Sequence, residues 1–181
     1  MKYGRLGMIA LAALTFGAMP AQAQFPLHMG VTAGVSFPNG DYGNAANMGY
    51  NGGGLLSFSA PMIPIGVRLE ASITHFPGKD YNAGGTTINA SSNIWTTGVA
   101  ATFDLPVPLP VKPYAIAGLG YYGAITTVNG IPGSTSTSKL GYNAGAGVSL
   151  MGHLFAEVRY HHMNTDGTAT TFVPLTFGIM F

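Results

Sequence analysis

The segment at 173–181 constrains the fold of this chain more than any other. Large apolar residues occupy every second position, and the last is an aromatic: Val173, Leu175, Phe177, Ile179 and Phe181. Apolar residues at a period of two place one continuous apolar face on a β-strand. The segment therefore predicts a strand that reaches residue 181 and turns an unbroken apolar face toward a core or toward lipid.

The composition indicates which of these surroundings applies. Only 7% of the residues are charged, against about 25% in an average soluble domain, and so few charges would make a poor soluble surface. After residue 23 no apolar run approaches the length of a membrane-spanning helix. Strands that face lipid are consistent with both observations. The chain has no Cys for a disulfide or a lipid anchor, and no basic patch for nucleic acid.

The amino-terminal segment has the pattern of a secretory signal peptide. Lys2 and Arg5 precede an apolar run at 6–19, and Ala21-Gln22-Ala23 forms a small-residue cleavage site. The run is too short for a spanning helix, which disfavours an uncleaved anchor. We therefore expect a cleaved signal peptide at 1–23 and a single barrel domain at 24–181.

Alternating segments along the rest of the chain predict an all-β fold. The links after the second, fourth and sixth segments are short or proline-rich, whereas the others are longer and polar. This pattern predicts an eight-stranded antiparallel transmembrane β-barrel with short periplasmic turns and longer extracellular loops, located in the cell outer membrane. Pro174 lacks a backbone donor, so we expect it near the outer rim. The lipid-facing side of 113–123 is left open. The predicted strands are 27–37, 50–60, 66–76, 93–105, 113–123, 139–150, 154–163 and 171–181.

Four charged residues are predicted to face the interior, which side chains fill in a barrel of this size. The third strand carries Arg68 and Glu70 on its inner face, and the seventh, opposite it, carries Glu157 and Arg159. The order of the charges is reversed, so Arg68 meets Glu157 and Glu70 meets Arg159. Because buried charges must be paired, these residues predict a structural salt-bridge network. A proton or ion path is the disfavoured alternative, since pairing already accounts for the charges.

Aromatic residues near the ends of the strands predict a girdle at the membrane interface. His75 and His162 are predicted to point toward lipid at the depth of this girdle. His161 and His162 face opposite sides of one strand and cannot share a metal ion, and no metal or cofactor site is predicted. The predicted interface aromatics on the outer side are Tyr50, Trp95, Tyr122, Tyr142 and Tyr160.

The stretch 160–165 resembles the His-x-Ser-Asn motif of the small outer-membrane lipid A deacylases. A full resemblance to these enzymes would imply a Ser/His/Glu triad that faces the bilayer. This chain has Asn164 at the nucleophile position, and its last strand has no acidic residue to orient His162. Without a nucleophile and an orienting acid the triad cannot operate. We therefore expect no enzymatic activity, with a degenerate deacylase-like hydrolase and a narrow channel as the alternatives.

Several motifs resemble the OmpA/OmpX-type family of small outer-membrane barrels: residues 30–34, Lys112-Pro113-Tyr114, Gly118-x-Gly120-Tyr121, 157–160 and the final Phe181. The resemblance implies a structural or surface-interaction role, such as envelope integrity, adhesion or host contact through extracellular loops, without an open pore. It implies outer-membrane lipid and lipopolysaccharide as surroundings, a monomer, and an unidentified surface partner. It also implies that the barrel-assembly machinery reads the carboxy-terminal signal Phe177, Ile179 and Phe181.

Overall fold

A computed structural model describes residues 27–59, 63–83, 86–107, 110–128, 134–165 and 168–181. The signal peptide predicted at 1–23 lies outside the described residues. No helix in the described ranges is long and apolar enough to cross a membrane. The elements are β1 (Leu27–Asn39), α2 (Gly40–Ala45), β2 (Gly49–Ser59), β3 (Ile65–Phe76), β4 (Asp80–Ala83), β5 (Thr86–Asp104), β6 (Val111–Val128), β7 (Ser134–Leu150), β8 (Leu154–Thr165) and β9 (Thr168–Met180).

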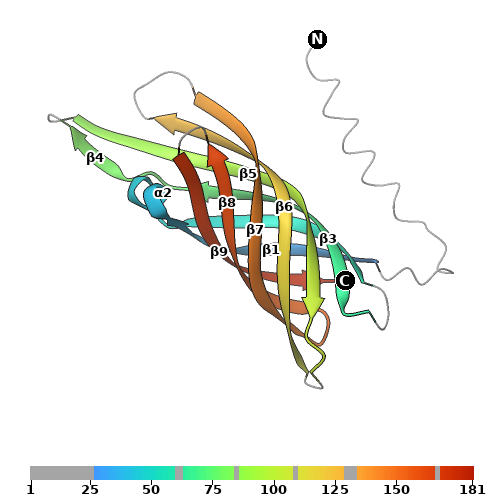
Figure 1. Cartoon of the computed structure of the whole chain (residues 1–181). Coiled ribbons are helices and arrows are strands. Elements are labelled where there is room, and N and C mark those ends of the chain that lie inside the picture. The colour runs from blue at the N-terminus through green and yellow to red at the C-terminus, as the bar shows by residue number, and fades with distance from the viewer. Residues whose placement is uncertain (1–26, 60–62, 84–85, 108–109, 129–133, 166–167) are drawn as a thin grey trace, which may run out of the picture.

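The strands form a closed antiparallel barrel. They follow the order β3-β2-β1-β9-β8-β7-β6-β5, and pairing of β3 with β5 closes the wall. The strand β4 pairs with β5. The curved wall is visible in Figure 1, in which the short helix α2 lies at the end of the barrel opposite the carboxy terminus. The predicted fold class, an eight-stranded antiparallel barrel, is confirmed.

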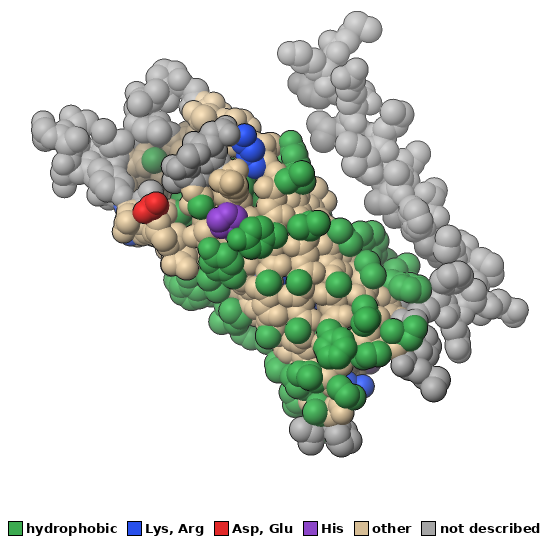
Figure 2. Space-filling view, viewed as in Figure 1, with side chains coloured by type: hydrophobic (Ala, Val, Ile, Leu, Met, Phe, Trp, Pro, Cys, Tyr) green, Lys and Arg blue, Asp and Glu red, His purple; other side chains and the backbone are tan. Residues whose placement is uncertain are grey.

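The side chains of each strand alternate between the lumen and the outer surface. On β8, Phe155, Glu157 and Arg159 are buried, whereas Val158 and Tyr160 are exposed. Figure 2 shows hydrophobic side chains spread over the barrel wall on one face, with few charged groups among them. The period of two predicted from the sequence therefore places apolar groups outside and the ionic groups inside.

Three strands extend at least five residues farther than the sequence predicts. The strand β5 begins at Thr86 rather than at 93, β6 continues to Val128, and β7 begins at Ser134 rather than at 139. The extensions are rich in Ser and Thr and lack the apolar alternation that marks a lipid-facing strand. Their pairing is carried by the backbone and by hydroxyl contacts such as Ser92 Oγ to Thr126 Oγ1 at 3.1 Å.

The expected position of Pro174 is wrong. The residue lies opposite Ser36 in the wall and is buried rather than near the outer rim. The β8–β9 ladder includes Val158 with Leu175 and resumes at His161 with Phe172. The interruption falls where the proline has no backbone donor to offer. The barrel therefore accepts the proline inside the wall because the ladder breaks locally.

Aromatic rings of several strands lie directly on glycines of the neighbouring strand. A Cβ added at any of these glycines would meet the ring, so the ring occupies the space that a side chain would need. Three of the pairs are direct cross-strand partners. The pairs are Tyr114 with Gly147, Tyr122 with Gly141, Phe155 with Gly178 and, on the outer surface, Trp95 with Gly123.

Candidate functional site

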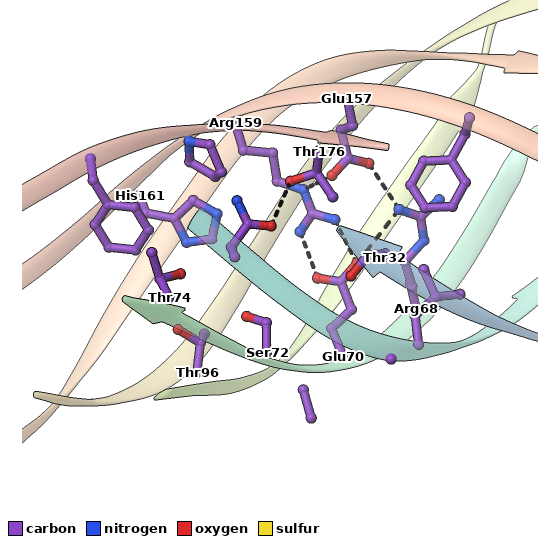
Figure 3. A pocket seen from close by; sticks show the side chains of 17 residues that line it. Thr32, Arg68, Glu70, Ser72, Thr74, Thr96, Glu157, Arg159, His161 and Thr176 are labelled. Atoms are coloured by element: carbon purple, nitrogen blue, oxygen red, sulfur yellow. Dashed lines mark hydrogen bonds and ion pairs between the residues drawn. The ribbon is translucent and has the colours of Figure 1, made fainter. Parts of the chain in front are cut away.

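The lumen contains the four charged residues that the sequence predicted. Arg68 and Glu70 project from β3, and Glu157 and Arg159 project from β8. Figure 3 shows the two pairs converging across the lumen from opposite walls. Each pair occupies positions i and i+2 of its strand, which directs both of its side chains to the same side.

Ion pairs join the four groups into a ring. Arg68 Nη1 lies 2.8 Å from Glu157 Oε2. Arg159 donates through Nη1 and Nη2 to the two carboxylate oxygens of Glu70, at 2.6 and 2.5 Å. Arg159 Nε also donates to Glu157, and Arg68 Nη1 lies 3.5 Å from Glu70 Oε1. The two-pronged contact of Arg159 with Glu70 is the strongest form of such a hydrogen-bonded pair.

Burial makes this pairing necessary. The side chains of Arg68, Glu157 and Arg159 are 4%, 3% and 7% exposed, whereas that of Glu70 is 22% exposed. Two cations and two anions give a ring with no net charge. An uncompensated ion at this depth would cost several kcal/mol, so each member depends on the others.

Neutral groups complete the surroundings of the ring. Tyr114 Oη donates to Glu157 Oε2 at 2.8 Å. The guanidinium of Arg68 lies over the rings of Tyr114 and Phe155, with Cζ 5.5 and 5.0 Å from their centroids, distances at which a cation is attracted to a ring face. Arg68 Nε is buried and has no hydrogen-bond partner among the described residues. The ring is thus held by hydrogen bonds on one side and by aromatic faces on the other.

The prediction that Tyr122 belongs to the membrane interface is wrong. Its side chain is 0% exposed, and its hydroxyl lies 2.9 Å from Nδ1 of His161. Asn143 Nδ2 donates to the same hydroxyl at 3.3 Å. The alternation of β6 turns Tyr121 outward and Tyr122 inward. This hydroxyl network was missed because two adjacent tyrosines gave no sign of which one faces lipid.

The other predicted interface aromatics face outward. Tyr50, Tyr142 and Tyr160 are exposed, and Trp95 is half-buried against Tyr121, with ring centroids 5.5 Å apart. His162 stacks on Tyr142 at 4.8 Å between ring centroids. Phe177, Ile179 and Phe181 are also exposed on the outer surface. Their role as an assembly signal stays a prediction.

Apolar layers lie on both sides of the charged ring. Between them and beside the ring is a cavity of about 60 Å³, lined by polar groups that include Asn51, Thr74 and Thr176. A polar cavity of this size has room for water. The lower layer contains Leu55, Ala100, Tyr114, Ile116 and Phe155. The upper layer contains Ala46, Phe76, Ile94, Tyr122, Met163 and Phe172.

The segment that contains α2 covers the upper layer. Tyr42 meets the edge of Phe76, with ring centroids 5.2 Å apart. Lys79 Nζ donates to the carbonyl oxygen of Gly43 at 2.7 Å, and Ala46 forms a β-bridge with Gly78. Burial raises the pKa of the Tyr42 hydroxyl above its ordinary value, so this contact remains uncharged. The outer end of the lumen is therefore covered by a segment with its own anchoring contacts.

The four charged groups of the lumen are paired with one another. In the described residues no group of three or more His, Asp or Glu side chains is placed to hold a metal ion. The ring directs its charges at one another. Each of the four ions therefore lies beside an ion of opposite charge within the ring.

The fold and this ionic interior define a small β-barrel that crosses the outer membrane. The sequence matches the family described as outer membrane protein beta-barrel domain over residues 8–181. The chain belongs to this family, and its location is the outer membrane. No curated protein matches the chain.

Solved structures show the same fold at low sequence identity. Neisserial surface protein A is 19% identical, with a TM-score of 0.57, over 85% of this chain and 95% of its own. Ail of Yersinia pestis is 16% identical, with a TM-score of 0.52, over 86% and 99%. OprG of Pseudomonas aeruginosa is 14% identical, with a TM-score of 0.52, over 85% and 95%. At these identities the likeness extends to the fold alone.

Proposed function

We propose that this protein is a closed outer-membrane barrel with a surface-interaction role, and not a channel. The observation that carries the proposal is the extension of β5, β6 and β7 beyond the rest of the wall. The pairing of β7 with β8 begins at Gly141, whereas its pairing with β6 reaches Ser134. In Figure 1 β5 and β6 reach past the ends of β8 and β9. This outer sheet lies on the extracellular side.

The outer sheet offers a strand edge for recognition. Residues 134–138, Ser-Thr-Ser-Thr-Ser, pair with β6 on one side, and the described part of β8 pairs with no residue of this stretch. A strand edge presents backbone donors and acceptors to an added strand. The stretch has no charge and no proline to block it. An extended segment of a surface partner is therefore the class of ligand that this edge favours.

Lysines on this edge are expected to reduce adhesion. Thr135→Lys combined with Thr137→Lys places charges on the edge and should reduce adhesion of cells that display the protein to near the level of cells without it. Thr127→Lys is the matched control, because Thr127 is exposed on β6 and paired on both sides. Cell-adhesion counts, normalised to surface expression, provide the measurement. Equal adhesion by the wild type, the double variant and Thr127→Lys would exclude this edge as the binding surface.

The closed lumen supports the second half of the proposal. Apolar layers above and below the ion ring leave a cavity of about 60 Å³ between them. Purified protein in planar bilayers is therefore expected to give no stable conductance steps. Reproducible steps from protein that shows heat-modifiable gel migration would contradict the closed-barrel proposal.

We also propose that the barrel is not a lipid A deacylase. His162 pairs across the sheet with Tyr142 and Thr171, neither of which is a carboxylate. It stacks on Tyr142, and Asn164 stands where the deacylases have their nucleophile. Incubation with lipopolysaccharide is expected to release no fatty acid. Release that disappears in His162→Ala would establish the enzyme instead.

A further inference from the structure

A hollow interrupts the lipid-facing surface of β2, β3 and β5. Gly54 on β2, Ala71 on β3 and Thr97 on β5 are successive cross-strand partners, so three small outward residues lie side by side. Larger outward residues stand on both sides of this row. Two adjoining hollows of about 320 and 580 Å³ share Ala71 and Thr97 in their linings. Their walls include Ile73 and Trp95 on one side and Met29, Leu56, Leu69 and Phe181 on the other.

Two glycines on β2 leave this space open although a side chain would fit. A Cβ at Gly54 would come no closer than 3.6 Å to its nearest neighbour, the Gly30 carbonyl oxygen. At Gly52 the nearest atom is the Thr32 carbonyl oxygen, also at 3.6 Å. By contrast, a Cβ at the inward-facing Gly53 would meet the backbone of Ala71. Close packing therefore explains the glycine at 53 but not those at 52 and 54.

A polar cluster lies at the outer end of the hollow. Tyr50, His75 and Asn93 are cross-strand partners in the next outward-facing row beyond Ile73 and Trp95. His75 Nδ1 lies 2.7 Å from Asn93 Oδ1, and the rings of Tyr50 and His75 are 5.1 Å apart. Tyr50 is 61% exposed, so its hydroxyl is accessible at the outer side. One row separates the apolar hollow from these hydrogen-bonding groups, and Gly52 leaves that row open on β2.

We propose that this hollow and cluster together bind one molecule of lipopolysaccharide. One acyl chain occupies the hollow, and the phosphates or sugar hydroxyls of the head group bond to the Tyr50 and His75 side chains. The outer membrane surrounds this wall with hydrocarbon, and a methylene chain is the part of that medium that fills an open apolar depression. The cluster lies toward the extracellular end, so the lipid comes from the outer leaflet. The binding is non-covalent and independent of the strand edge on β7.

Native mass spectrometry of the refolded, detergent-solubilised chain tests the proposal with purified rough lipopolysaccharide as the probe. We expect a saturable one-to-one adduct. Gly54→Leu and, separately, Gly52→Leu fill the hollow and should weaken binding by about tenfold or more. His75→Ala should weaken binding through loss of the head-group contact.

Tryptophan fluorescence gives a second readout. The only tryptophan of the chain, Trp95, borders the hollow. The emission maximum of the wild type should therefore shift when lipopolysaccharide is added.

Ala144→Leu is the matched control, because Ala144 is exposed on the outer surface of β7 and gains the same side chain. It should bind as the wild type does. Heat-modifiable migration confirms closure of each barrel. Equal affinity in folded Gly54→Leu, or no saturable adduct, overturns the proposal. Equal binding of phosphatidylethanolamine overturns the assignment to lipopolysaccharide, and a protein dimer lost in Gly54→Leu would assign the hollow to a second copy.

Discussion

Replacement of Glu157 by alanine is expected to lower the free energy of unfolding by about 3–5 kcal/mol. The carboxylate accepts hydrogen bonds from Arg68 Nη1 and Tyr114 Oη, both at 2.8 Å, and contacts Arg159 Nε as well. Without it two guanidinium groups share the single carboxylate of Glu70. The interior then carries an uncompensated positive charge between two apolar layers, where the cavity of about 60 Å³ offers little solvation.

Urea unfolding in detergent micelles, followed by Trp95 fluorescence, provides this measurement. Glu70→Ala is the comparison, because its carboxylate is 22% exposed and retains part of its hydration. Glu70→Ala should therefore lower the free energy of unfolding by less than Glu157→Ala does. Combining Glu157→Leu with Arg68→Met removes one charge of each sign and should recover much of the stability. If Glu157→Ala unfolds within about 1 kcal/mol of the wild type, the ring is solvated and does not stabilise the barrel.

Phe76→Ala is expected to cost about 3–5 kcal/mol and also to loosen the segment over the lumen. The side chain is 0% exposed and packs between Phe172, at 5.6 Å between ring centroids, and Tyr42 of α2, at 5.2 Å. The alanine leaves a cavity in the upper apolar layer and removes the main aromatic contact of α2. Tyr42 should therefore become accessible at the outer end of the barrel.

Two readouts separate these effects. Urea unfolding reports the stability of the barrel, and limited chymotrypsin digestion of the folded protein reports the accessibility of Tyr42. Phe58→Ala is the control, because Phe58 is exposed on the lipid-facing surface of β2 and fills no internal space. It should lose less stability and keep Tyr42 protected. Unchanged digestion at Tyr42 in folded Phe76→Ala would show that α2 is held by its other contacts.

The ionic interior was predictable because two simple constraints coincide. The period of two turns Arg68 and Glu70 to one side of β3, and the reversed order of Glu157 and Arg159 on the opposite strand matches opposite charges across the lumen. No propensity argument was needed, since so few charges remain in the barrel that their mutual placement is nearly fixed. The structure brings these four side chains together.

Other features could not be predicted because their sequence pattern has no period. On β6 the segment around Tyr121 and Tyr122 alternates small residues with aromatics on both faces, which left the lipid-facing side undecided. The outer extensions of β5 to β7 contain Ser and Thr on both faces, so no apolar alternation marks them as strands. The helix α2, with the sequence Gly-Asp-Tyr-Gly-Asn-Ala, is fixed by tertiary contacts such as Tyr42 with Phe76.

The rings that rest on glycines have a consequence for how the wall closes. Tyr114 lies on Gly147, its direct partner on β7, and Phe155 lies on Gly178, its direct partner on β9. A slip of either pair by two residues would keep inside and outside unchanged, so hydrophobicity alone would not oppose it. For Phe155 a slip in either direction would place the ring against Thr176 or Met180, both of which have side chains. For Tyr114 a slip in one direction would meet Ser149, whereas the other would meet Gly145. The contact of Phe155 with Gly178 therefore opposes misalignment of β8 and β9 in both directions during assembly.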